Sequence, residues 1–351
     1  MSDHPSQPST PPPPEGGDTV LSSAAVNPSG NTSSSARPPV AQRGRFAHRV
    51  QPQRKPDWIR MELPGGDSFR DIKGLLKERS LHTVCEEANC PNLGECWRGG
   101  TATMMVLGET CTRGCRFCAV KTGNPGGLLD ADEPRKVAEA VELMKLRYVV
   151  LTSVDRDDLA DGGSEHFAQC VREIKARRPQ TLVECLVPDF QGDADCVRKL
   201  AVDAGLDVFA HNVETTRRLT PKVRDRRSGF DQSIEVLRLA KEQNPEVVTK
   251  TSIMLGLGET ERELDQCFVE IREVGVDVLT LGQYLRPSLL HLPVKEYVTP
   301  ARFRALEQRA LRYGFAYVAA GPMVRSSYKA AEFYLESRLG RERMKKQRAA
   351  E

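Results

Sequence analysis

The chain has 351 residues and a mass of 39.0 kDa, which is enough for one large barrel-type domain with appendages. Its formal net charge of +3 is too small to indicate a nucleic-acid partner, and no apolar run approaches the length that spans a membrane. Ten cysteines in a chain of this length, with no recognisable signal peptide, do not fit the disulfide framework of a small secreted protein. We therefore expect a cytoplasmic protein that binds neither nucleic acid nor membrane.

The first 45 residues are rich in proline, serine and glycine and include four consecutive prolines, Pro11 to Pro14. Such a segment buries too little apolar surface to offset the entropy of the chain, so we predict a disordered tail over residues 1–45. The segment has no lysine or arginine before Arg37 and carries acidic residues, whereas transit peptides are basic and poor in acids. Mitochondrial import is therefore the weaker interpretation. We expect residues 46–100 to form an N-terminal extension.

From about residue 101, segments with strand-like and helical patterns alternate, which predicts right-handed βαβ units and a parallel sheet. Six strands predict an α/β fold, a partial (β/α)6 barrel of the TIM type, over residues 101–290, with a C-terminal extension over residues 291–351. The strand candidates are 103–109, 148–154, 181–187, 207–214, 247–257 and 276–285. The helical candidates lie near 134–146, 164–178, 193–204, 231–243 and 260–274. Pro134 suits a first helical turn, and Asp231 and Thr260 suit N-terminal caps.

Three cysteines follow the first predicted strand in the spacing C-x3-C-x2-C: Cys111, Cys115 and Cys118. Three thiolates on one short loop leave one iron of a four-iron four-sulfur cube open. Enzymes of the radical S-adenosylmethionine (SAM) superfamily use that iron to chelate the amine and carboxylate of SAM. Zinc sites more often show paired C-x2-C units that close all four positions. In parallel α/β barrels the reactive centre lies at the carboxyl ends of the strands, which is where this loop begins.

A second triplet, Cys85, Cys90 and Cys96, lies upstream of the first strand and indicates a second cluster. The remaining four cysteines are scattered within helical or strand-like patterns. We interpret these four as small buried apolar side chains. They are Cys170, Cys185, Cys196 and Cys267.

With CEEANCPNLGECW, CTRGCRFCAV and a late RSSYKA on one chain, the sequence resembles the lipoyl synthase family over roughly residues 55–335. None of the seven presumed ligand positions departs from the family pattern. The long N-terminal tail and the arginine-rich stretch 217–227 are less typical. Other similar stretches are VLTSVDRDDLADGG, ECLVPDF, HNVET, KTSIMLGLGE and GQYLRPS.

The resemblance implies a division of labour between the two triplets. The C-x3-C-x2-C triplet holds the cluster that cleaves SAM to methionine and a 5′-deoxyadenosyl radical. That radical removes hydrogen from carbons six and eight of an octanoyl chain on a lysine of a lipoyl carrier domain. The upstream triplet holds an auxiliary cluster that supplies both sulfur atoms, so two SAM molecules are used. The carriers implied are subunits of 2-oxoacid dehydrogenases and the glycine-cleavage carrier protein, and the electron donor is a ferredoxin or flavodoxin.

The resemblance also assigns the fourth ligand of the auxiliary cluster to a serine of RSSYKA. We place it at Ser327, with Ser326 as the alternative. An alkoxide is a harder ligand than a thiolate and a poorer match for an iron–sulfur core, so this bond should be the easiest to release. That property suits a cluster that gives up sulfide. The other interpretation is that both serines cap a helix that follows them.

Three further residues are candidates for contact with SAM. Phe117 lies between the last two cysteines and is expected beside the adenine, the alternative being simple loop packing. Asn212 and Glu214 alternate onto one face near a strand end, where they could reach the ribose or the amine of SAM. The alternative for this pair is a cap on the following helix.

Two charged runs follow predicted strands. For the acidic run Asp155 to Asp161 we expect a solvated turn rich in helix caps, with one member in contact with SAM. For the arginine-rich stretch 217–227 we expect either a solvated loop or a surface that steers an acidic carrier domain.

Two other functions compete with this interpretation. A methylthiotransferase or a biotin synthase would keep the radical chemistry and change the substrate. The first normally has a longer N-terminal domain for its auxiliary cluster, and the second lacks an N-terminal triplet of this kind. A structural zinc protein is the non-enzymatic alternative, and colour separates it, since iron–sulfur proteins are brown and zinc proteins are colourless.

Overall fold

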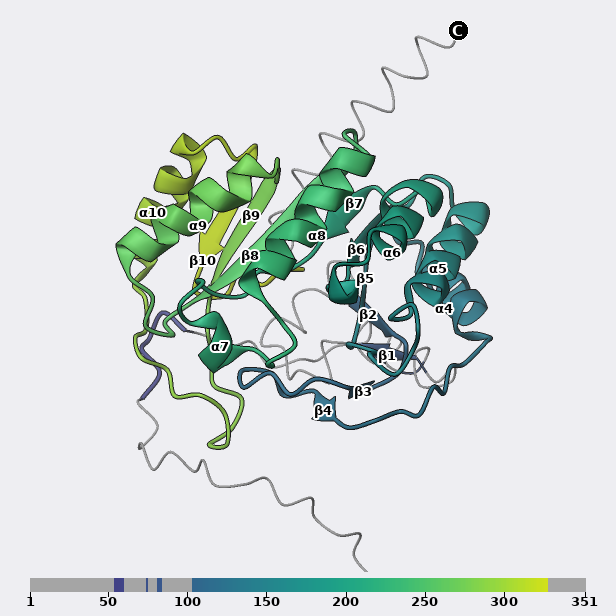
Figure 1. Cartoon of the computed structure of the whole chain (residues 1–351), viewed down its shortest axis with the longest axis horizontal. Coiled ribbons are helices and arrows are strands. Elements are labelled where there is room, and N and C mark those ends of the chain that lie inside the picture. Colours follow the sequence, from purple (N-terminus) through teal and green to yellow (C-terminus); the bar gives the residue numbers. More distant parts are fainter. Residues whose placement is uncertain (1–53, 60–73, 75–80, 84–102, 328–351) are drawn as a thin grey trace, which may run out of the picture. The chain divides into compact units, whose positions relative to one another are not determined.

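The computed structural model describes residues 54–59, 74, 81–83 and 103–327 (Figure 1). The predicted tail and the upstream triplet of Cys85, Cys90 and Cys96 lie outside the described residues.

Among the described residues, eight strands form one sheet in the order β1-β2-β5-β6-β7-β8-β9-β10 (Figure 1). Every neighbouring pair from β2 to β10 is parallel, and only β1 (His82–Thr83) runs antiparallel to its neighbour. The parallel strands are β2 (Thr103–Val106), β5 (Tyr148–Ser153), β6 (Leu182–Leu186), β7 (Val208–Ala210), β8 (Val248–Leu255), β9 (Val278–Gln283) and β10 (Tyr317–Gly321). A separate two-stranded sheet pairs β3 (Thr110–Cys111) with β4 (Lys121–Thr122). The predicted α/β architecture with a parallel sheet is confirmed.

Helices connect the parallel strands and pack on one face of the sheet. They are α4 (Glu133–Leu143), α5 (Ser164–Arg177), α6 (Ala194–Arg198), the π-helical turn η2 (Lys199–Asp203), α8 (Phe230–Gln243), α9 (Glu261–Glu273) and α10 (Pro300–Arg312). The short helix α7 (Thr220–Val223) lies in the connection between β7 and α8, beside the cysteine loop. Alternate strand residues such as Val149 and Leu151 join helix residues in one core cluster, and Leu279 and Leu281 do so in a second. The intervening residues form a third cluster from strands alone. This alternation is what a parallel sheet with one helix-covered face requires.

The helix starts follow local capping chemistry. Thr260 is confirmed as the cap of α9: its hydroxyl accepts from the Glu263 amide, and the Glu263 carboxylate accepts from the Thr260 amide at 2.8 Å. Pro134 is confirmed in the first turn of α4. The expectation for Asp231 is wrong, because α8 begins at Phe230 and Gly229 takes the capping position. Asp231 instead pairs with Arg217 at 2.5 Å.

The sheet extends one unit beyond the six predicted strands. Within the predicted C-terminal extension, α10 begins after Thr299, whose hydroxyl accepts from the Arg302 amide, and it buries Phe303, Leu306 and Ala310 at helical spacing. The following strand β10 then pairs in parallel with β9. This extra unit places residues 321–327 at the carboxyl edge of the sheet.

An ion pair lies on the strand-only face of the sheet, among apolar side chains. Lys250 of β8 donates to both carboxylate oxygens of Glu184 on β6 at 2.8 Å, and Tyr148 of β5 also donates to that carboxylate. Only 2% of Lys250 and 1% of Glu184 are exposed. Each charge is therefore stabilised mainly by the other, because both side chains are shielded from water.

Candidate active site

The C-x3-C-x2-C triplet lies on the loop that follows β2, at the carboxyl edge of the sheet. Cys111 ends β3, while Cys115 and Cys118 lie in the turn that comes after it. All three are free thiols and half-buried. The thiol of Cys118 interacts electrostatically with those of Cys111 and Cys115, so the three sulfurs share one region. The prediction that this loop lies at the carboxyl ends of the parallel strands is confirmed, because it follows β2 at that edge of the sheet.

Backbone amides are directed at two of these sulfurs. The Arg113 amide donates to Cys111 Sγ at 3.4 Å, and the Asp225 amide donates to Cys115 Sγ at 3.3 Å. Amide hydrogen bonds to sulfur are a standard means of stabilising and tuning iron–sulfur clusters. Burial raises the pKa of Cys111 and of Cys115 to about 12, so iron binding must displace protons from these thiols.

These donors fit an iron–sulfur cluster by their chemistry. Three soft thiols on one loop, two of them receiving amide hydrogen bonds, match the ligand set of such a cluster. In the part of the chain that the structure describes, no group of three His, Cys, Asp or Glu side chains is arranged to hold a metal ion. A cluster differs from a single ion because each of its irons takes one thiolate, which spreads the ligands apart.

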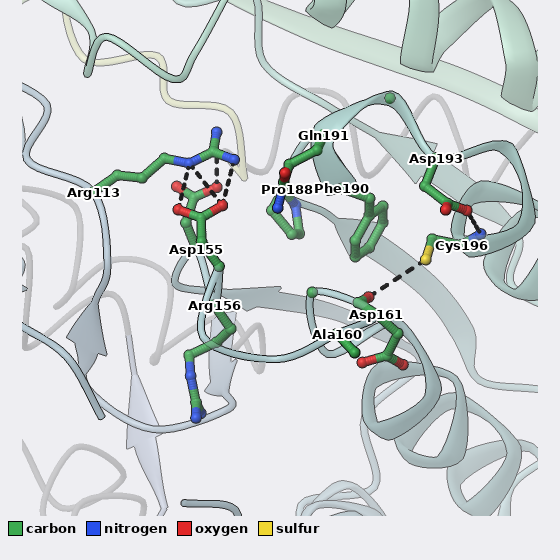
Figure 2. Close-up of a pocket in the computed structure, with 13 residues that line it drawn as sticks. Arg113, Asp155, Arg156, Ala160, Asp161, Pro188, Phe190, Gln191, Asp193 and Cys196 are labelled. Atoms are coloured by element: carbon green, nitrogen blue, oxygen red, sulfur yellow. Dashed lines mark hydrogen bonds and ion pairs between the residues drawn. The ribbon is translucent and has the colours of Figure 1, made fainter. Parts of the chain in front are cut away.

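Arg113, inside the cysteine motif, extends from the loop into a set of carboxylates, of which Asp189 is buried and Asp155 and Asp157 are half-buried (Figure 2). Its Nε and Nη2 donate to Asp157 at 3.0 and 2.7 Å, and its Nη1 and Nη2 donate to Asp189 at 2.6 and 2.8 Å. Nη1 also lies 3.3 Å from Asp155 Oδ1 and donates to Ser228 Oγ at 3.1 Å. The prediction that the acidic run is a solvated turn is therefore wrong for Asp155 and Asp157, which pair with Arg113.

The rest of the acidic run has local partners. Asp158 accepts from Arg156 at 2.8 Å. Asp161 accepts from the amides of Gly163 and Glu165 at 3.0 and 2.9 Å and so serves the start of α5. The capping part of the expectation is confirmed at Asp161.

The arginine-rich stretch lies along the cysteine loop. The Arg116 amide donates to the Val223 carbonyl at 2.9 Å, and Asp225 Oδ2 accepts from the Gly114 amide at 2.9 Å. Arg227 Nη2 donates to the Thr112 carbonyl at 2.6 Å. These contacts make the stretch part of the wall that holds the loop.

Carrier steering by this stretch stays a prediction, but fewer of its basic side chains are available for it than the sequence indicated. Arg224 is buried and donates to Ser233 Oγ at 2.7 Å, while Arg227 pairs with Asp157 and Asp225 at 3.1 and 2.9 Å. The positive charge that a docking carrier could meet is therefore smaller than the count of basic residues indicated. The sequence missed this because it does not show which arginines face inward.

Asn212 and Glu214 follow β7, and Asn212 Nδ2 donates to Glu214 Oε1 at 3.1 Å. Glu214 has a left-handed backbone (φ 70°) and exchanges backbone hydrogen bonds with β8. Burial raises the pKa of the Glu214 carboxyl, which interacts electrostatically with Cys118. Neither residue caps α7 or α8, so the helix-cap alternative is wrong.

Phe117 packs beside the apolar group of Leu219, Val223, Leu257 and Tyr284. Loop packing is therefore present at this residue, and contact with an adenine stays a prediction. Ser326 and Ser327 are half-buried and follow β10 at the same edge of the sheet as the cysteine loop. The helix expected after them lies outside the described residues.

A cavity of about 270 Å³ opens between the carboxyl ends of β5 and β6 (Figure 2). Arg113 and Asp155 form one side of it, and the Phe190–Gly192 turn forms another. The cavity is therefore continuous with the carboxylate set that holds Arg113.

His211 is fully buried next to the site and belongs to a chain of hydrogen bonds. Its Nδ1 lies 2.9 Å from the Val187 carbonyl, and its Nε2 lies 2.9 Å from Ser233 Oγ, which accepts from Arg224. Because a carbonyl only accepts, Nδ1 carries the proton and Nε2 accepts from the serine. Burial, followed by the nearby Arg224 charge, lowers the pKa of His211 from 6.5 to about 4.

This shift predicts a loss of stability on acidification. Below pH 6.5 the unfolded chain protonates His211, while the folded protein resists protonation down to about pH 4. We expect about 2 kcal/mol of unfolding free energy from this residue to be lost between pH 7 and pH 5. Comparing denaturant unfolding of wild type and His211→Gln at both pH values isolates the contribution. An equal pH slope in the two proteins would contradict the assignment.

Comparison of the sequence with known proteins places the chain in a family. The model of the radical SAM superfamily matches residues 105–270, and the model of the N-terminal domain of lipoyl synthase matches residues 31–90. Lipoyl synthase of Halorhodospira halophila is 59% identical over 278 residues, which cover 79% of this chain and 83% of that protein. The chain belongs to the lipoyl synthase family. It is a radical SAM enzyme that inserts sulfur.

Other relatives agree with this membership. The mitochondrial lipoyl synthase of Drosophila mojavensis is 56% identical over 299 residues, which cover 84% of this chain and 82% of that protein. Among solved structures, HydG, a maturase of the FeFe-hydrogenase, has a TM-score of 0.50 at 14% identity and covers 72% of this chain and 63% of its own. That likeness concerns the fold alone. Membership of the lipoyl synthase family implies SAM and iron–sulfur clusters as cofactors and a lipoyl carrier protein as substrate.

No helix among the described residues combines the length and the apolarity that crossing a membrane requires.

Proposed function

We propose that this lipoyl synthase family member holds two four-iron four-sulfur clusters, with Cys111, Cys115 and Cys118 as ligands of the cluster that binds SAM. The observation that carries this proposal is the loop itself: three half-buried free thiols, two of them receiving amide hydrogen bonds, at the carboxyl edge of a parallel sheet. When bound, this cluster supplies the electron that cleaves SAM to methionine and a 5′-deoxyadenosyl radical.

Asn212 and Glu214 are proposed to orient SAM beside that loop. Glu214 is half-buried and accepts a hydrogen bond from the side-chain amide of Asn212, and its carboxylate interacts electrostatically with Cys118. A buried carboxylate is stabilised by a cationic ligand, and SAM carries an ammonium and a sulfonium. Phe117 is proposed to contribute an apolar surface for the adenine, next to the side chains on which it already packs.

The upstream triplet of Cys85, Cys90 and Cys96 is proposed to hold the auxiliary cluster together with Ser327. The substrate is then an octanoyl chain on a lysine of a lipoyl carrier domain, in a 2-oxoacid dehydrogenase subunit or the glycine-cleavage carrier protein. Sulfur enters at carbons six and eight. A ferredoxin or flavodoxin would supply the electrons. A reducing compartment suits the free thiols, and we propose the cytoplasm.

A single assay tests the reaction. The purified protein is reconstituted with iron and sulfide under anaerobic conditions and incubated with SAM, a reductant and an octanoylated carrier. We expect the carrier mass to increase by two sulfur atoms in the dithiol product, or by two sulfur atoms less two hydrogens after that product oxidises to the disulfide, and two SAM molecules to be cleaved for each product. A carrier of unchanged mass, in a sample that cleaves SAM, would assign the protein another substrate.

The role of Ser327 has its own test. We expect Ser327→Ala to preserve SAM cleavage and to impair sulfur insertion, because only the auxiliary cluster loses a ligand. Ser326→Ala is the matched control, since it removes the neighbouring hydroxyl at an equally half-buried position, and it should have the smaller effect. Both activities are measured on the same reconstituted samples. Equal, full lipoylation by the two variants would return these serines to a helix-capping role.

A further inference from the structure

Arg113 has an environment that the reaction chemistry does not require. It lies inside the cysteine motif, yet only 3% of it is exposed, and its guanidinium points away from solvent into carboxylates of two strand ends. The two partners with paired hydrogen bonds, Asp157 and Asp189, lie 44 and 76 residues further along the chain. A planar guanidinium that meets two carboxylates in paired hydrogen bonds has one well-defined position.

We propose that Arg113 is a positioning residue that holds the cysteine loop at the carboxyl ends of β5 and β6, in the conformation that receives the cluster, before any iron binds. This inference rests on the proposed role of the three cysteines as cluster ligands. A loop is free to move unless its side chains or backbone are tied to the scaffold. Here the tie comes from Arg113, one of the three residues between Cys111 and Cys115.

The contacts around Arg113 connect it to the ligands themselves. The backbone amide of Arg113 donates to Cys111 Sγ. The Asp155 carboxylate lies 3.3 Å from Arg113 Nη1 and 3.8 Å from Cys111 Sγ. Thr112 Oγ1 lies 2.8 Å from Asp157 Oδ2. A shift of the guanidinium would therefore disturb the carboxylates that contact Cys111 Sγ and Thr112, which are the first ligand and the residue after it.

A second set of contacts supports the loop from the other side. Arg227 pairs with Asp157 at 3.1 Å and also donates to the Thr112 carbonyl. Asp225 accepts from the Gly114 amide, and its own amide donates to Cys115 Sγ. The loop residues 112 to 115 thus have side-chain or backbone hydrogen bonds to Asp157, which follows β5, and to Asp225 and Arg227, which lie between α7 and α8, and none of these bonds involves a metal. Such preorganisation lowers the entropy that cluster binding would otherwise have to overcome.

Arg156 provides a matched control. Like Arg113 it is a buried arginine, with 2% of it exposed, and it lies just after β5. It binds Asp158 through two hydrogen bonds of 2.8 Å and donates to the carbonyls of Leu107 and Leu128 at 2.9 Å. Its hydrogen bonds match those of Arg113 in kind, but none of them involves residues 111–118. Substituting it measures the general cost of removing a buried arginine there.

The test compares wild type, Arg113→Lys, Arg113→Gln and Arg156→Lys, each as the full chain. In the metal-free proteins, the alkylation rates of Cys111, Cys115 and Cys118 by iodoacetamide are followed by peptide mass spectrometry. We expect Arg113→Gln to raise these rates by at least about tenfold, the equivalent of one charge-assisted hydrogen bond. Arg113→Lys should raise them less, and Arg156→Lys should stay near wild type. In the reconstituted proteins, a chelator should remove iron faster in the same order.

Two outcomes overturn the proposal. One is a folded Arg113→Gln with alkylation and chelation rates within twofold of wild type. The other is an equal change in Arg113→Lys and Arg156→Lys, which would reduce Arg113 to a general contributor to stability. If Arg113→Gln fails to fold, Arg113→Lys and Asp189→Asn carry the comparison. A wild-type protein that binds no iron–sulfur cluster would instead refute the proposed function, and the metal-free measurement separates the two failures.

Discussion

The Cys115→Ala variant is expected to lose all SAM cleavage, because the cluster that binds SAM loses one of its three thiolate ligands. Cys90→Ala is expected to cleave SAM at a rate near wild type and to form no lipoylated carrier, because the sulfur source is gone. The structure places Cys115 on the loop beside Asp225 and Arg113, and Cys90 lies outside the described residues. The two variants therefore separate the two triplets by function.

Both activities can be measured in one anaerobic reaction, with 5′-deoxyadenosine reporting SAM cleavage and carrier mass reporting sulfur insertion. Cys196→Ala is a suitable control, since Cys196 is a buried thiol at the start of α6 and lies outside both triplets. It should retain both activities. A Cys90→Ala protein that still lipoylates the carrier would show that the upstream triplet is not the sulfur source.

The largest effect on stability is expected at the buried ion pair. In Lys250→Met, the Glu184 carboxylate keeps its hydrogen bond from Tyr148, but none of the described residues supplies a counter-charge to it, in a region from which water is excluded. We expect the free energy of unfolding to fall by about 3–5 kcal/mol, the usual consequence of leaving a buried charge without its partner. Denaturant unfolding followed by circular dichroism measures the change.

The double variant Lys250→Met/Glu184→Gln is the control for this prediction. It removes both charges and keeps an amide that can accept from Tyr148, so most of the lost stability should return. If the double variant lost as much stability as Lys250→Met and Glu184→Gln lose together, the two residues would not be a coupled pair. Lys241→Met is a useful comparison, because Lys241 pairs with Asp277 at 2.8 Å where both are partly exposed, and its loss should be much smaller.

Local signals in the sequence were sufficient for the elements and for the chemistry of the cysteine loop. The strand–helix alternation predicted six strands of the sheet and the helices between them, because alternating burial and helical spacing are properties of neighbouring residues. These strands are β2, β5, β6, β7, β8 and β9. The same holds for the cap at Thr260. The unit of α10 and β10 carries comparable signals at Thr299 and in the apolar residues 317–319, but the sequence alone does not show that β10 pairs with β9.

Contacts between distant segments needed the tertiary structure. Sequence placed Arg113 in a motif, but its partners lie 44 and 76 residues further on, at the ends of strands whose adjacency is set by the sheet order. The requirement for glycine at Gly256 also depends on a distant segment, because a Cβ atom there would lie 2.3 Å from the Glu296 carbonyl oxygen. Sequence determined which atoms are available for the chemistry, since spacing and residue type are local. Only packing decided which charges are buried together, because burial depends on segments that meet after the chain has folded.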